Sequence, residues 1–140
     1  MYNSLSFQLK RTLNPVPKLK AAMRQALKRS SLSREQIVEE MNKMAGREGL
    51  TTGGRAQKIS LALLEKWVAA SATNQVIPLK YLPIFCQVVE DITPLMVLAK
   101  CLGYEVIGEE DQKLLLWAKM EREKRRAAKK AKKLAEELGI

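Results

Sequence analysis

Side chains that commonly carry enzyme chemistry are sparse in this chain of 140 residues. Histidine, the commonest general base, is absent. Cys86 and Cys101 have neither an activating partner nearby in the sequence nor the spacing of metal ligands. The glycine pair at 53 and 54 is too short for a phosphate-binding loop, and the acidic runs at 39–40 and 109–111 are typical of exposed helix positions. We therefore expect no enzyme, no cofactor, no metal ion and no small-molecule ligand.

The two cysteines lie in apolar patterns of helical spacing, which favours buried, reduced thiols over a disulfide. The chain contains no run of 18 apolar residues, and its first residues lack the pattern of a signal peptide. We expect a cytoplasmic protein that does not cross a membrane.

Lysine and arginine are distributed unevenly. The formal net charge is +10, from 25 basic and 15 acidic residues. Residues 1–30 contain seven basic and no acidic side chains, and residues 119–133 contain nine basic and two acidic ones. Basic ends around a mildly acidic body favour a polyanionic partner, nucleic acid above all. Two solvated charged faces are the alternative.

Two helices with recognisable N-caps must position any contact with nucleic acid. Ser33 and Gln36 form a capping box at the start of a helix that we expect to end near Gly46. Its buried face would hold Ile37, Val38, Met41 and Met44. Residues 47–58 then form a glycine-rich loop or a small hairpin.

The second of these helices is short and follows Ser60, which is its N-cap. Its inward face would hold Leu63, Leu64 and Trp67. Spacing predicts further helices at 17–29, 78–89, 94–102 and 109–138. In the first of these, basic residues lie opposite the apolar stripe. The third follows Thr93, which we expect to be its N-cap. Pro83 lies either in a first turn or at a kink, and residues 104–107 form a short extended segment.

The predicted fold class is therefore all-α. We expect an arm at 1–16, a helical domain at 17–108 with an inserted loop at 47–58, and a long basic helix at 109–140.

The two short helices meet the requirements of a helix-turn-helix, because the first can brace the second and the second has small residues at its tip. The candidate base-reading residues are Ser60, Leu61, Ala62, Glu65 and Lys66. The candidate phosphate contacts before the tip are Arg55, Gln57 and Lys58. Further non-specific contacts would come from Lys124, Arg125, Arg126, Lys129 and Lys130.

The segments that contain these helices resemble those of known protein families. The segment LSREQIVEEM followed by ISLALLEKW resembles the lambda-repressor-like helix-turn-helix superfamily. The following IPLKYLPIFCQVVEDITPLMVLAKCLG is similar to the core helices of phage CII-type regulatory proteins, so the resemblance covers residues 18–107. It implies a lambda-repressor-like bundle of about five helices, and a phage or prophage regulator of transcription that binds double-stranded DNA.

Two positions depart from that pattern. The loop at 47–58 replaces a tight turn, and it either adds a phosphate clamp or blocks the groove. Leu61 can touch a thymine methyl group but cannot form a hydrogen bond with a base edge. An alternative is therefore a phage adaptor that keeps this core and binds protein, which outward-facing Leu61 and Leu63 would support. RNA binding is disfavoured because no aromatic stacking platform is evident.

The last helix has an apolar stripe that resembles a short coiled-coil seam. The candidate oligomerisation residues are Leu116, Met120, Ala127, Ala131, Leu134 and Leu138. They predict a homodimer or a higher homo-oligomer. The alternative is a helix that docks on its own domain through Leu114, Leu115, Leu116 and Trp117 and then runs free.

Overall fold

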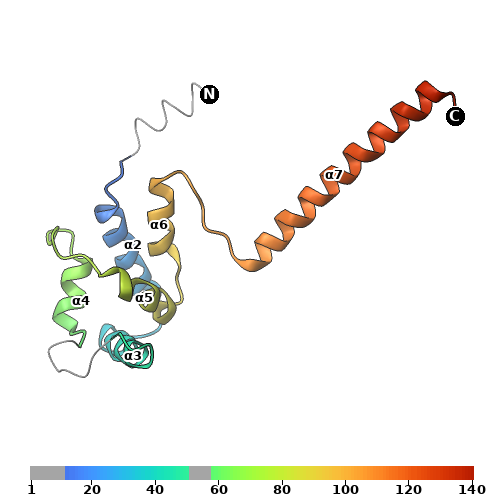
Figure 1. Ribbon diagram of the computed structural model, residues 1–140. Helices are drawn as coiled ribbons and strands as arrows, with labels where there is room; N and C mark the ends of the chain where they lie inside the picture. The colour runs from blue at the N-terminus through green and yellow to red at the C-terminus, as the bar shows by residue number, and fades with distance from the viewer. Residues whose placement is uncertain (1–11, 51–57) are drawn as a thin grey trace. The chain divides into compact units, whose positions relative to one another are not determined.

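The computed structural model describes residues 12–50 and 58–140, and every regular element within them is helical. This confirms the all-α class and the long C-terminal helix. In chain order the elements are α2 (Val16–Arg29), α3 (Arg34–Arg47), α4 (Leu61–Val68), the 3-10 turn η2 (Leu79–Tyr81), α5 (Leu82–Val89), α6 (Thr93–Cys101) and α7 (Glu109–Leu138) (Figure 1). None of the described helices is long and apolar enough to span a bilayer.

The chain divides into two compact units, and the second begins at Val106. In the first unit α2 packs against α4 and α6, α3 packs against α4 and α5, and α5 packs against η2 and α6. Met23, Ile37, Met41, Leu64 and Phe85 are completely buried and come from four different helices. One continuous apolar core therefore joins α2, α3, α4 and α5.

The start of α3 agrees with the sequence-based expectation, whereas its end does not. Ser33 and Gln36 form the predicted capping box, with the Ser33 N–H donating to Gln36 Oε1 at 2.8 Å. The helix ends at Arg47, one residue past the expected end near Gly46, but the glycine that terminates it is Gly49 rather than Gly46. Gly49 adopts the left-handed conformation (φ 68°), and the Leu50 N–H donates to the Ala45 carbonyl, which is the Schellman termination.

The prolines of the next two elements occupy permissive positions. Pro78 precedes the turn η2, and α5 begins only at Leu82, so Pro83 lies in the first helical turn and causes no kink. The predicted N-cap at Thr93 is wrong: α6 begins at Thr93, and the Asp91 carboxylate accepts the Thr93 N–H at 2.9 Å. Residues 104–107, expected to be extended, form an irregular connection without a strand.

Three smaller expectations need correction. α2 begins at Val16 rather than at residue 17 or 18, with the Val16 N–H bonded to Asn14 Oδ1. Its basic residues do not all face solvent, because Lys20 is buried. Cys86 and Cys101 are free thiols, as expected, but both are only half-buried. Burial raises the pKa of the Cys86 thiol, which keeps that thiol protonated.

Candidate nucleic-acid interface

Helix α4 is the element on which the candidate site depends. It has eight residues, too few for a stable isolated helix, so its order must come from its surroundings. Leu64 and Trp67 are 0% and 3% exposed, and the Trp67 ring lies 6.0 Å from that of Tyr81. These two predicted anchors are confirmed, and Val68 is a third buried residue.

The N-terminal end of α4 is attached to α3. Ser60 is the predicted N-cap, and its hydroxyl accepts the Leu63 N–H at 3.1 Å. The preceding residue, Ile59, is held by both polar atoms of the Asn42 side chain. Asn42 Oδ1 accepts the Ile59 N–H at 2.9 Å, and Asn42 Nδ2 donates to the Ile59 carbonyl at 2.8 Å. The chain therefore enters α4 at a fixed point on α3, whatever the length of the connection between the two helices.

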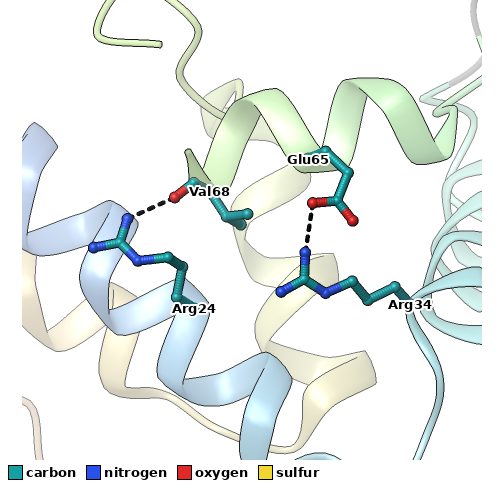
Figure 2. Close-up of polar contacts among 4 residues, drawn as sticks. All are labelled: Arg24, Arg34, Glu65 and Val68. Carbon is teal, nitrogen blue, oxygen red and sulfur yellow. Dashed lines mark hydrogen bonds and ion pairs between the residues drawn. The ribbon is translucent and has the colours of Figure 1, made fainter. Parts of the chain in front are cut away.

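The side of α4 is attached to α3 by an ion pair. Arg34, in the first turn of α3, donates to Glu65 Oε2 at 2.5 Å (Figure 2). Both side chains keep more than a third of their surface exposed, so the pair adds little stability. The pair engages the Glu65 carboxylate, while the orientation of α4 is set by its buried residues Leu64 and Trp67.

The C-terminal end of α4 is held by two cations from α2. The Lys20 ammonium donates to the carbonyls of Lys66 at 2.9 Å, Trp67 at 3.0 Å and Gln75 at 2.5 Å. Arg24 donates to the Val68 carbonyl at 2.6 Å (Figure 2). The last carbonyls of a helix lack partners within the helix and carry partial negative charge, so cations are well suited to this end.

Lys20 is buried as an ammonium group. Burial, and then the neighbouring charge of Arg24, lower its pKa from the ordinary value of 10.5. The three carbonyls require three N–H donors, however, and only the protonated amine has three. The cation therefore belongs to the framework that supports α4. Sequence reasoning missed it because Lys20 lies next to an apolar stripe in a helix rich in lysine and arginine.

Only some of the predicted base-reading residues are exposed. They are the N-cap residue Ser60 and, on α4 itself, Ala62 and Lys66. Leu61 packs partly against the core, and the carboxylate of Glu65 is engaged by Arg34. The exposed candidate residues therefore form a small surface with one cation, Lys66.

Among the predicted phosphate contacts, Lys58 is exposed and lies two residues before the Ser60 cap. Arg55 and Gln57 lie outside the described residues. The support expected for a protein-binding adaptor is lacking, because Leu61 and Leu63 are both half-buried and pack against the core.

The remaining candidate residues belong to α7 and are all exposed. They comprise the five basic residues Lys124, Arg125, Arg126, Lys129 and Lys130, and the six stripe residues Leu116, Met120, Ala127, Ala131, Leu134 and Leu138. No side chain of α7 is buried. Within the described ranges, no group of histidine, cysteine or carboxylate side chains has a geometry that could hold a metal ion.

Comparisons of the chain with models of protein families, with curated proteins and with solved structures found no match.

Proposed function

We propose that this protein is a transcriptional regulator, encoded by a phage or prophage, that binds double-stranded DNA through α4. One observation carries the proposal: a helix of eight residues is anchored at its start, its side and its end, yet Ser60, Ala62 and Lys66 remain exposed on it. A helix that reads the major groove needs both a rigid mounting and a free, closely approaching face.

The residue types on this face fit DNA. Ser60 and Ala62 are small enough for close approach, and the Ala62 methyl group can contact a thymine methyl. Lys66 can donate to guanine or to phosphate, and Lys58 precedes the helix where phosphates would lie. Because Leu61 and Glu65 are engaged within the protein, few side chains are left for base reading. The proposal therefore predicts a short recognised sequence, with much of the affinity coming from phosphates.

Selection from random duplexes by the full chain tests the proposal. We expect an enriched motif, and we expect Lys66→Ala to weaken binding to that motif by about 1–3 kcal/mol and to relax the preference at one base position. Lys58→Ala should weaken binding to all sequences alike. Lys100→Ala is the matched control, because Lys100 is an exposed lysine on α6.

Two results would contradict the proposal. One is a selection without an enriched motif, which would leave a basic adaptor or a non-specific binder. The other is full affinity of the Lys58→Ala and Lys66→Ala variants at moderate salt, which would remove α4 from the interface.

A further inference from the structure

Helix α7 exposes apolar side chains along its whole length. It has 30 residues, none of them buried. Leu116 is 59% exposed, Met120 63%, Leu134 56% and Leu138 72%. At 3.6 residues per turn, these four residues and Ala127 and Ala131 fall on one side of the helix. A stripe of this kind is typical of a helix that packs against another helix.

The charges of α7 restrict the orientation of such a partner. Residues 109–123 contain five acidic and three basic side chains, whereas residues 124–138 contain seven basic and two acidic ones. A parallel pair of α7 helices would set two strongly basic halves side by side. An antiparallel pair sets each basic half along the acidic half of the other copy, so the net interaction changes from repulsion to attraction.

Side-chain volume along the stripe favours the same orientation. In the antiparallel register that places Glu123 opposite Lys124 of the second copy, Leu116 faces Ala131 and Met120 faces Ala127. Large side chains then meet small ones at these two layers, which fills the centre of the interface evenly, whereas Leu134 and Leu138 lie opposite Lys113 and Glu109 beyond it. A parallel pair would instead set alanine against alanine in the second half, where the helices would leave gaps.

We propose that α7 pairs with α7 of a second copy of this chain in the antiparallel orientation, through the part of the stripe from Leu116 to Ala131. The two chains then enter the pair from opposite ends of a helix about 45 Å long. Acidic side chains face each other only at the two ends of the pair, where they can turn into solvent. The proposal does not depend on DNA binding, and its tests contain no DNA, so either proposal can fail alone.

Distances between spin labels on the full chain distinguish the orientations. Each variant carries one new cysteine, Gln112→Cys or Lys124→Cys, in a Cys86→Ala, Cys101→Ala background whose fold is checked by circular dichroism. Lys124 lies at the centre of the pair, so its two labels should be close together. The two labels at position 112 should lie about 35 Å apart, because they are 23 residues apart along the axis.

Short distances at both positions would show a parallel pair and overturn the proposal. The absence of a short distance at position 124 would show that the proposed register does not form, and would also overturn it.

A second test compares two identical substitutions on different sides of α7. Leu116→Gln changes the stripe, whereas Leu114→Gln changes a residue about 200° away around the helix. In sedimentation equilibrium of the full chain, we expect Leu116→Gln to raise the dissociation constant of the pair at least 10-fold and Leu114→Gln to change it less than 3-fold. Equal losses from both substitutions, or no self-association of the parent chain, would contradict a seam along Leu116.

Discussion

At the scale of single residues, Lys20 has the most demanding position. It is the one charged side chain in the described ranges that is buried, at 1% exposure, and its three donors all bind backbone carbonyls. An ammonium group taken out of water is stable only when its hydrogen-bonding capacity is filled. The carbonyls of Lys66 and Trp67 depend on it in turn, so Lys20 and the end of α4 are stable only together.

Lys20→Met should therefore lower the free energy of unfolding by about 3 kcal/mol or more, because it leaves three inward-facing carbonyls without a donor. Urea denaturation followed by circular dichroism measures the loss. Lys18→Met is the matched control: Lys18 is exposed on the same helix, so its loss should stay within about 0.5 kcal/mol. Equal stabilities of the two variants would mean that Lys20 does not support α4.

Asp91 predicts a pH dependence. Its hydrogen bonds to Thr93 and, less strongly, the charge of Arg29 hold the pKa of the carboxyl below its ordinary value of 3.8. The folded state thus binds this proton less readily than the unfolded state. The stabilisation by the carboxylate is complete above about pH 5 and is lost as the pH falls through the lowered pKa.

Asp91→Ala should consequently destabilise the protein by about 1 kcal/mol at pH 7, because the Thr93 N–H loses its hydrogen-bond acceptor. The difference between parent and variant should shrink between pH 4 and pH 3. Urea titrations at pH 7, 5 and 3 measure it. A difference that stays constant over this range would show that the carboxylate charge is not involved.

At the scale of elements, helix ends show what the sequence could and could not predict. The capping boundaries at Ser33 and Ser60 and the full extent of α7 follow from local signals, and all three agree with the structure. The end of α3 does not, because Gly46 and Gly49 are equally suited to a stop. In the structure the terminating glycine is Gly49, and Leu50 beyond it packs against the core.

The supports of α4 were beyond sequence reasoning for a different reason. Asn42 in α3 and Lys20 and Arg24 in α2 look like ordinary polar positions of amphipathic helices. Their partners are backbone groups 17 to 55 positions away in the chain, and backbone groups leave no mark in a sequence. The buried anchors of α4 were predictable from helical spacing, whereas the contacts that hold the helix and the engagement of Leu61 and Glu65 required the packed structure.

The end of α5 predicts a stabilising change. Glu90 has φ 54°, which is the left-handed conformation. The other three described residues with a positive φ are all glycines. This conformation costs a residue with a side chain about 1–2 kcal/mol relative to glycine. Replacement by glycine recovers only a part of this cost, because glycine has more conformational freedom in the unfolded chain and loses it on folding. Glu90→Gly should therefore raise the free energy of unfolding by about 0.5–1 kcal/mol in urea denaturation.

The matched control at this position is Glu90→Ala. It removes the same carboxylate but keeps a Cβ atom, so it should bring no gain. A gain of the same size from alanine would trace the effect to the charge of Glu90 rather than to the backbone.

At the scale of the whole molecule, the distribution of charge predicts how the proposed DNA binding divides between specific and general contacts. The exposed face of α4 holds a single cation, Lys66, whereas α7 holds the five candidate residues Lys124, Arg125, Arg126, Lys129 and Lys130, all exposed. Each phosphate that a cation neutralises contributes about 0.9 to the slope of log affinity against log salt. The two regions can therefore be separated by the salt dependence of binding.

Replacing these five residues of α7 by glutamine should reduce the salt slope by about 4 and weaken binding equally for all duplexes, because phosphate contacts carry no sequence information. Lys66→Ala should reduce the slope by at most about 1 while it changes which duplexes are preferred. Fluorescence anisotropy at a series of salt concentrations measures both effects, with circular dichroism to confirm that α7 stays helical. If the glutamine variant keeps the parent slope, the basic half of α7 does not contact DNA, and its charges act within the proposed antiparallel pair or in solvent.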